Sequence, residues 1–347
     1  MTAVTAFGPG WVNLLGEHTD YNDGLCLPFA IALGVTVQGE PLAGGRVLAQ
    51  ATDLGEDDDF VAAQPPRGAA GWRAFVRGTV GELRDAGHPI EGARLRIAGD
   101  VPRGSGLSSS AALSTALALA LLALADEDEP DRRALARLCS RVENDWVGAQ
   151  TGLLDQLAAL FGREGHALRL DCCDLSIEAV PLELRGWRLA VAPSGHEHDH
   201  AGSGYNERRA ECRAACEALG IASLREAPPD APDALPAPLD RRVRHVLAEN
   251  ARVDAAVAAL RDGDLPALGA LLDASHASLR DDYEVSVEAV ERTVARLKEA
   301  GAAGARIVGG GFGGSVLALL PPDAALPGDA TVVEPAASAR VARSPDH

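Results

Sequence analysis

The sequence predicts a protein of mixed helices and strands in about two domains, for three reasons. Its 347 residues are too many for one small module and suit two domains of ordinary size. A hydrophobic fraction of 47% and a charged fraction of 24% are typical of a globular chain. Segments with strand patterns alternate with segments of helical pattern along the chain. We place the domain boundary near residue 185, so that residues 1–185 form one domain and residues 186–347 the other.

Strands are expected in several parts of the chain. The N-terminal segment indicates a strand at Val4 to Gly8, a loop through Asp23 and Gly24, and a strand from Leu25 to Val37. Residues Ala93 to Ala98 alternate in a way that suits a half-buried strand. The remaining strand segments are His166 to Val191, with several short strands, and Arg306 to Leu320, where a glycine loop separates two apolar strands.

The run from Ala111 to Ala125 is apolar throughout and predicts a helix that is buried on most sides. At about 15 residues it is too short to span a bilayer, and the acidic block Asp126 to Glu129 follows it. Further helical patterns cover Asp131 to Gln150, a segment that begins near Gly152, Arg241 to Arg261, and Ser286 to Ala300. Between them, Leu224 to Asp240 holds five prolines and indicates a loop.

Charge and lysine content exclude several classes of function. The formal net charge is −18, so phosphate backbones and anionic lipid surfaces would repel the chain, and we expect neither nucleic acid nor a membrane as a partner. The only lysine is Lys298, inside a predicted helix, whereas a Walker A loop or a protein-kinase strand needs a lysine at the phosphates. Any binding of ATP must therefore use another route.

The cysteines and the N-terminal segment indicate a reducing compartment. None of the six cysteines forms a Cys-x-x-Cys pair, so a zinc ribbon or a thioredoxin-type site is unsupported. Met1 to Gly10 has neither the basic region nor the apolar core of a signal peptide. We therefore expect a cytoplasmic protein with free thiols.

A glycine- and serine-rich segment before the apolar helix predicts a phosphate site. The first turn of a helix has unpaired N–H groups and a partial positive charge. Glycines allow close approach of a phosphate, and serine hydroxyls add donors or a magnesium ligand. A serine N-cap is the simpler interpretation, but three consecutive serines after two spaced glycines are more than a cap requires. The residues of this loop are Gly104, Ser105, Gly106, Leu107, Ser108, Ser109 and Ser110.

Acidic residues supply two further candidates. The turn Gly16 to Tyr21 gathers two carboxylates, an imidazole and an aromatic ring, which suits hydrogen bonding to several hydroxyls of a polar ligand, although a solvated turn would also explain it. Glu143 and Asp155 lie on successive predicted helices. One carboxylate is suited to holding Mg²⁺ with a serine of the phosphate loop and the other to accepting a proton, but spacing alone does not select them from the other acids.

Two other patterns are weaker. Gly309 to Gly314 satisfies G-x-G-x-x-G, but the dinucleotide fingerprint must open a helix, and Ser315 to Leu320 indicates a strand. A dinucleotide enzyme is therefore a distant alternative. The alternating His196, His198 and His200 could bind a metal from one face of a strand, but a polar loop before a helix explains them adequately.

In this order, the motifs resemble those of the galactokinases within the GHMP small-molecule kinase family. Asn13 to Gly24 is similar to a motif that other GHMP kinases lack, and Gly106 to Ala112 resembles the family's phosphate loop. The other matching segments are Glu143 to Gly148, Gly152 to Gln156, Tyr205 to Arg209 and Ile307 to Gly314. The resemblance runs over nearly the whole chain and is weakest at residues 224–240 and after residue 320.

The resemblance implies an α+β fold of two mixed α/β domains of the GHMP kinase type, with the active site in the cleft between them. It implies a monomer that transfers the γ-phosphoryl group of ATP to the C1 hydroxyl of galactose, with ATP and Mg²⁺ bound. Asp155 would accept the C1 proton, and Ser110 and Glu143 would hold Mg²⁺. The loop Gly104 to Ser110 would wrap the phosphates, and Trp72 would lie near the adenine. The residues expected to bind the sugar are Glu17, His18, Asp20, Gly152 and Tyr205.

One departure from the family pattern bears on activity. Where the family has Ala-Pro-Gly-Arg-Val-Asn-Leu, this chain has Gly8-Pro-Gly-Trp-Val-Asn-Leu14. In the family the arginine lies near the catalytic aspartate and stabilises the charge of the transferred phosphoryl group, whereas the indole of Trp11 has one N–H donor and no charge. The loss could cost on the order of 10³-fold in rate, unless a cation such as Arg103 replaces it. Two hypotheses follow: a working but impaired galactokinase, or a galactose- and ATP-binding protein that has largely lost the chemistry.

Overall fold

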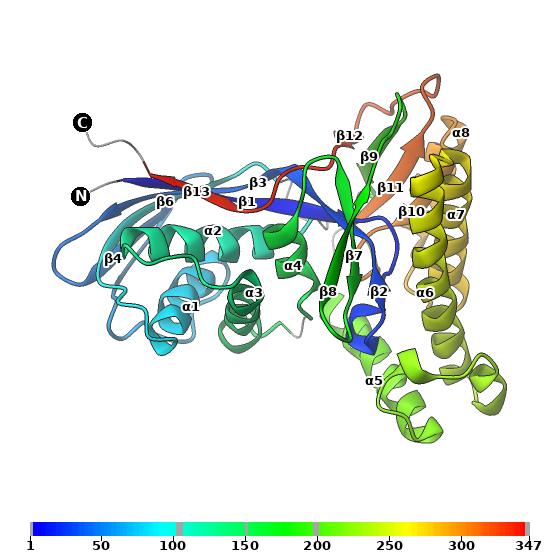
Figure 1. The fold of residues 1–347 in the computed structure, drawn as a ribbon, viewed down its shortest axis with the longest axis horizontal. Coiled ribbons are helices and arrows are strands. Elements are labelled where there is room, and N and C mark those ends of the chain that lie inside the picture. Colours follow the sequence, from blue (N-terminus) through cyan, green and yellow to red (C-terminus); the bar gives the residue numbers. More distant parts are fainter. Residues whose placement is uncertain (1–2, 102–106, 150–151, 197–200, 344–347) are drawn as a thin grey trace.

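The computed structural model describes residues 3–101, 107–149, 152–196 and 201–343, with the side chains of residues 201–203 left out. Figure 1 shows a broad sheet with helices on one face, and next to it a second group of strands with long helices along their outer side. The mixture of helices and strands predicted from the sequence is confirmed.

The broad sheet has six strands in the order β13-β1-β3-β6-β4-β5. Its strands are β1 (Val4–Asn13), β3 (Pro28–Pro41), β4 (Arg46–Ala51), β5 (Glu56–Val61), β6 (Ala93–Gly99) and β13 (Arg340–Arg343). β4 and β6 pair in parallel, and the other neighbours pair antiparallel. Most of this sheet is formed by the first hundred residues.

Four helices lie on one side of the six-stranded sheet (Figure 1): α1 (Trp72–Asp85), α2 (Ser109–Leu124), α3 (Arg132–Arg141) and α4 (Leu154–Phe161). α2 packs directly on β1 and β3. Every residue from Ala111 to Leu122 is buried, which confirms the prediction of a helix enclosed on most sides. Among the described residues, no helix combines the length and apolar character needed to cross a bilayer.

Two smaller sheets complete the fold. One contains β2 (Leu25–Cys26), β7 (His166–Asp171) and β8 (Ser176–Pro181), and the other has the order β10-β11-β9-β12. The strands of the second are β9 (Arg188–Pro193), β10 (Gly304–Ile307), β11 (Ser315–Leu320) and β12 (Thr331–Val333). The helices of this half are α5 (Ala201–Leu219), α6 (Leu239–Asp262), α7 (Leu265–Asp281) and α8 (Glu288–Glu299).

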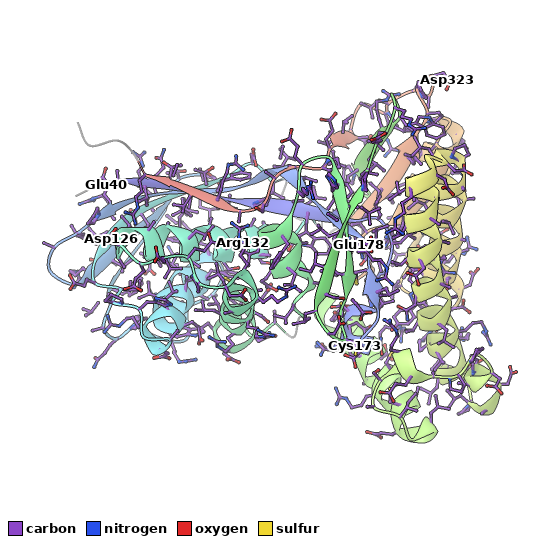
Figure 2. All side chains as sticks on the ribbon, in the orientation of Figure 1. Glu40, Asp126, Arg132, Cys173, Glu178 and Asp323 are labelled. Carbon is purple, nitrogen blue, oxygen red and sulfur yellow. The ribbon has the colours of Figure 1, made fainter. Side chains whose placement is uncertain are left out.

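The last strand returns to the first sheet. β13 pairs with β1, with Arg343 opposite Val4, so the two ends of the chain lie together (Figure 1). Arg132, which is labelled in Figure 2, holds the segment before β13: its Nη1 donates to Ser338 Oγ at 2.7 Å and its Nη2 to the Ala339 carbonyl at 3.1 Å. The tail thus closes an edge of the sheet, a role that the sequence analysis did not anticipate.

Two expected elements are interrupted in the structure. The helix predicted for Asp131 to Gln150 ends as α3 at Arg141 and continues as a π-helical turn, Val142–Val147, that stops at Gly148 with φ +87°. The strand predicted for Leu25 to Val37 breaks at Leu27, whose N–H donates to the Leu15 carbonyl at 2.9 Å. At this break the chain passes from the three-stranded sheet to the six-stranded sheet.

Several elements were not predicted, among them α1, α7, β4 and β5. The start of α7 does have a sequence signal: Asp264 accepts from the Ala267 N–H as an N-cap, and Pro266 lies in the first turn. Gly263, with φ +70°, ends α6 just before it. The segment from Leu224 to Asp240 is an excursion with two 3-10 turns, Leu224–Glu226 and Ala231–Ala234, in agreement with the predicted loop.

Candidate active site

The N-terminus of α2 meets the start of α4 at Asp155. Ser108 precedes α2 with a left-handed backbone, φ +53°, and its Oγ donates to Asp155 Oδ2 at 2.5 Å. The backbone N–H of Trp11 donates to the Leu107 carbonyl at 3.3 Å, which joins the end of β1 to the same segment. Ser109 and Ser110 begin α2. The predicted loop residues Gly104, Ser105 and Gly106, together with Arg103, lie outside the described residues.

Asp155 lies among other acidic side chains. Burial raises the pKa of Asp155 to about 7, and the negative charges of Glu143, Asp20 and Glu17 act in the same direction, while the hydrogen bond from Ser108 opposes them. The four acids therefore lie close enough to repel one another. At neutral pH the Asp155 carboxyl is poised between its protonated and ionised forms, which is suited to a general base.

Glu143 lies on the π-helical turn, a type of turn that is frequent at functional sites. Its side chain is 5% exposed, and one carboxylate oxygen accepts from Gln156 Nε2 at 2.7 Å. A carboxylate oxygen of this side chain could serve as a donor atom for a cation. With the Ser110 hydroxyl, the pair offers only oxygen donors, the set that Mg²⁺ prefers.

Groups from the second half of the chain hold Glu17. Its Oε1 accepts from the Gly309 N–H at 2.8 Å and lies 2.9 Å from Arg306 Nη2. Arg306 is fully buried, and its Nη1 also donates to the carbonyls of Asn13 and Leu14 at 3.1 and 2.8 Å. Burial raises the pKa of Glu17, and the positive charge of Arg306 limits that rise. The sequence analysis did not select Arg306, although a single charged residue in the apolar strand β10 was a signal for it.

Gly152 brings the Gly16–Tyr21 turn next to the helix of Asp155. A Cβ atom added at Gly152 would lie 2.7 Å from Asp20 Oδ2, so a larger residue here would displace the Asp20 carboxylate. Burial and the charge of Glu17 raise the pKa of Asp20 to about 6. Because Gly152 lies three residues before Asp155, the Gly16–Tyr21 turn and the acid of α4 are neighbours.

His18 is surrounded by aromatic rings. Its backbone is left-handed, φ +62°, and its ring lies 5.5 Å from that of Tyr205 and 4.7 Å from that of Tyr283, measured between centroids. Burial lowers the pKa of His18 to about 3, and the nearby His245 adds to this effect. The imidazole is therefore neutral at physiological pH. Tyr283 and His245 were not predicted as site residues.

The glycine segment between β10 and β11 packs on the same site. Gly309 and Gly311 have φ values of +77° and +82°, and a Cβ atom added at Gly310 would lie 3.0 Å from Tyr205 Cδ2. Because β11 is a strand and not a helix, the expectation that this segment is no dinucleotide fingerprint is confirmed.

The two tryptophans have different surroundings. Trp11 is 7% exposed, and its Nε1 has no hydrogen-bond partner in the part of the chain that the structure describes. Trp72 begins α1, donates from Nε1 to Glu56 Oε2 at 2.8 Å, and has the Arg73 guanidinium 4.9 Å from its ring centroid. The role of Trp72 near an adenine stays a prediction.

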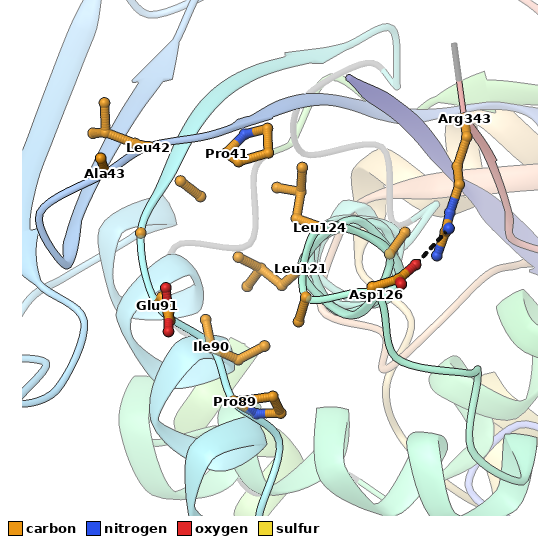
Figure 3. Close-up of a pocket in the computed structure, with 14 residues that line it drawn as sticks. Pro41, Leu42, Ala43, Pro89, Ile90, Glu91, Leu121, Leu124, Asp126 and Arg343 are labelled. Atoms are coloured by element: carbon orange, nitrogen blue, oxygen red, sulfur yellow. Dashed lines mark hydrogen bonds and ion pairs between the residues drawn. The ribbon is translucent and has the colours of Figure 1, made fainter. Parts of the chain in front are cut away.

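The other features singled out lie elsewhere or outside the described residues. Over those residues, no group of three or more His, Cys, Asp or Glu side chains has a metal-binding arrangement, and His198 and His200 are not described. The pocket in Figure 3 lies at the distal end of α2, where Arg343 contacts Asp126 at 2.6 Å. It contains none of the predicted site residues.

Comparison with known proteins identifies related sequences. Three family models match: the galactokinase galactose-binding signature over residues 2–41, the GHMP kinases N terminal domain over residues 74–163, and the GHMP kinases C terminal model over residues 256–327. The chain is 44% identical over 327 residues to a galactokinase of Roseiflexus sp. (strain RS-1), covering 91% of this chain and 83% of that protein. It is 43% identical over 328 residues to a galactokinase of Mycobacterium bovis (strain BCG / Pasteur 1173P2), covering 93% and 90%.

A solved structure agrees with the sequence comparisons. The Lactococcus lactis galactokinase, crystallised with galactose, superposes with a TM-score of 0.90 at 34% identity and covers 97% of this chain and 95% of its own. The fold is thus the α+β fold of two mixed α/β domains that the resemblance implied. From the motifs, the arrangement of the site and these matches, the chain belongs to the galactokinase family of GHMP kinases.

Proposed function

We propose that this protein transfers the γ-phosphoryl group of ATP to the C1 hydroxyl of galactose. The observation that carries the proposal is the position of Asp155. Ser108, at the N-terminus of α2, donates to Asp155, and Gly152 on the same segment packs against Asp20. A helix N-terminus suited to phosphates, an acid with a raised pKa and a turn suited to a polyhydroxyl ligand thus lie side by side.

We propose the residue roles that the family resemblance implies, and the arrangement supports them. Asp155 accepts the proton of the C1 hydroxyl as O1 attacks the γ-phosphorus and the bond to the ADP oxygen breaks. The N–H groups at the start of α2 and the hydroxyls of Ser109 and Ser110 bind phosphate oxygens. Sugar hydroxyls are bound by Glu17, His18, Asp20 and Tyr205, with Gly152 providing room for Asp20. Trp72 is proposed to contact the adenine.

Mg²⁺ fits the donor set of Ser110 and Glu143. Both offer oxygen atoms, and the negative charges of Glu143, Asp20 and Glu17 all act on Asp155. When bound, the ion would neutralise charge on the phosphates and on the transferred phosphoryl group. Glu143 is held for this task by Gln156, which occupies one of its two carboxylate oxygens.

Trp11 is proposed to slow the reaction. The backbone N–H of Trp11 donates to the Leu107 carbonyl, next to Ser108, whose Oγ donates to Asp155; these contacts support a position of Trp11 near the catalytic acid. Each charge that acts on the Asp155 carboxyl from Glu143, Asp20 and Glu17 is negative. An arginine here would stabilise both the ionised aspartate and the transferred phosphoryl group, which the neutral indole does not do.

The test measures galactose 1-phosphate formed from galactose and Mg-ATP by the parent protein and by Trp11→Arg and Trp11→Met. Met removes the indole without adding charge. A rate increase on the order of 10³-fold that occurs only in Trp11→Arg would therefore show that the parent is slow because the guanidinium is missing. Equal rates for the parent and the Arg variant would refute this role of Trp11. Galactose binding by calorimetry without turnover, in the parent and in the Arg variant, would instead favour a binding protein.

Three further assignments are proposals of ours. A cytoplasmic location rests on the free cysteines of the described residues. A monomeric state, which gel filtration tests, is the family default. The boundary near residue 185 precedes β9, the first strand of the four-stranded sheet.

A further inference from the structure

All three tyrosines of this chain surround one histidine. The centroid distances from the His18 ring are 5.9 Å to Tyr21, 5.5 Å to Tyr205 and 4.7 Å to Tyr283. Tyr21 follows His18 by three residues, whereas Tyr283 comes after α7, more than 260 positions along the chain. All the phenol groups of the protein therefore lie next to one imidazole.

Two of these tyrosines form a chain of hydrogen bonds behind His18. Nδ1 of His18 lies 2.9 Å from Tyr21 Oη, which lies 3.0 Å from Tyr283 Oη. Tyr283 Oη in turn lies 3.0 Å from Cys212 Sγ. Asn22 Nδ2 donates to the same sulfur at 3.7 Å. Side chains from three separate parts of the sequence are therefore linked by hydrogen bonds to the imidazole.

Packing holds this series of hydrogen bonds in place. The Tyr283 ring is fully buried between two imidazoles, with centroid distances of 4.7 Å to His18 and 4.4 Å to His245. His245 is itself fixed by Ser278 Oγ at 2.9 Å and by the Glu17 carbonyl at 3.1 Å. The Tyr283 hydroxyl consequently has few alternatives to its bonds with Tyr21 and Cys212.

The direction of these bonds decides what His18 offers to a ligand. A neutral imidazole carries its proton on one nitrogen only. Burial raises the pKa of Cys212 to about 11, so its sulfur is protonated and, with Asn22 already donating to it, can donate to Tyr283. The distances themselves allow either direction along this series of bonds. With Cys212 as the donor at its end, Tyr283 donates to Tyr21, and Tyr21 donates to Nδ1 of His18. The proton of the imidazole is then on Nε2, which is buried and has no hydrogen bond of normal distance and angle among the described residues, while the backbone of Gly310 lies close enough to act on the ring.

We propose that Tyr283 is a positioning residue for sugar recognition: through Tyr21 it fixes the tautomer and orientation of His18, so that Nε2–H is a hydrogen-bond donor to one galactose hydroxyl. The inference rests on the proposed function and names what that function requires of His18. Without the Tyr283 hydroxyl, Tyr21 Oη can accept from Nδ1–H instead, and the tautomer with an unprotonated Nε2 gains population.

The test compares Tyr283→Phe with the parent, because Phe keeps the ring and removes only the hydroxyl. Kinetics are measured on galactose and on its 2-, 3-, 4- and 6-deoxy analogues. His18→Gln is measured on the same sugars to identify the hydroxyl that His18 binds. On the deoxy analogue that lacks this hydroxyl, His18→Gln should cause no loss of activity. We expect Tyr283→Phe to lower kcat/KM for galactose about tenfold, the loss of about one hydrogen bond. The analogue lacking that same hydroxyl should show no loss, and the KM for ATP should stay unchanged.

The matched control is Thr293→Val, which removes a buried hydroxyl of α8 bonded to the Ala289 carbonyl at 3.0 Å. It should leave the sugar profile unchanged. Histidine ¹⁵N spectra, in which His18→Gln assigns the His18 signals, give a second readout that needs no turnover. We expect the Nε2–H tautomer of His18 in the parent and a mixture of tautomers in Tyr283→Phe. Equal losses on all sugars, no loss at all, or an unchanged tautomer would overturn the inference. A parent protein that fails to phosphorylate galactose would refute the proposed function but leave the tautomer measurement intact.

Discussion

The buried ion pair between Arg306 and Glu17 leads to a prediction about stability. In Arg306→Met the unbranched side chain still fills much of the space, but Glu17 keeps a buried carboxylate without its cation. The carbonyls of Asn13 and Leu14 also lose a donor. We expect the free energy of unfolding to fall by about 3–5 kcal/mol, the usual cost of removing one member of a buried pair. For a chain of this length, that corresponds to a decrease in Tm of about 5 °C.

The double variant Glu17→Gln/Arg306→Met separates the charge from the packing. Because Gln carries no charge, the double variant should recover about 2 kcal/mol relative to the sum of the single variants. Arg292→Met is the control for the same substitution at an exposed pair, Arg292 with Glu288 on α8, where little change in Tm is expected. Thermal unfolding followed by circular dichroism measures the parent, both single variants Glu17→Gln and Arg306→Met, the double variant and the control.

The loss of stability in Arg306→Met should also depend on pH. Without the arginine the pKa of Glu17 in the folded state rises further, so the folded variant holds a proton that the unfolded chain has released. The stability of the variant relative to the parent should therefore be greatest near pH 4–5 and fall as the pH rises to 8. A loss below about 1 kcal/mol at pH 7, or strict additivity in the double variant, would show that Arg306 and Glu17 are not coupled.

Three other predictions concern single residues. Burial alone would raise the pKa of Glu249, but its cationic neighbours and the Gly16 N–H lower it to about 2. Glu249→Gln should therefore lower the Tm at pH 7, and this decrease in Tm should become smaller as the pH falls from 4 toward 2. Melting curves recorded over this pH range measure the change. The rate should rise with pH through about 7 as Asp155 ionises, and Ser108→Ala should shift that midpoint upward, since its hydrogen bond favours the ionised carboxyl; an unshifted profile would contradict this. Gly152→Ala should raise the KM for galactose about tenfold without affecting that for ATP, because its Cβ would crowd a sugar-binding carboxylate.

Local patterns in the sequence were sufficient for the elements that depend on nearby residues. The apolar run at Ala111 to Ala125 led to the buried helix α2, and the two prolines after Leu320 showed that the preceding segment was a strand. The motif order led to the family, and with it to the residues of the Gly16–Tyr21 turn. Each of these inferences rests on chemistry within a few positions along the chain.

Only the tertiary structure could identify the partners of those residues. Arg306 pairs with Glu17 across almost 290 positions, and Tyr283 reaches His18 through Tyr21 from beyond α7. Whether Asp155 is poised near neutral pH depends on burial and on three other carboxylates, which the fold brings together. The sequence by itself determined the fold class, the family and the candidate side chains, because these follow from composition, periodicity and motif order. The tertiary structure decided which charges are neutralised and which groups are oriented, because electrostatic and hydrogen-bonding energies depend on distances between side chains that are remote in sequence.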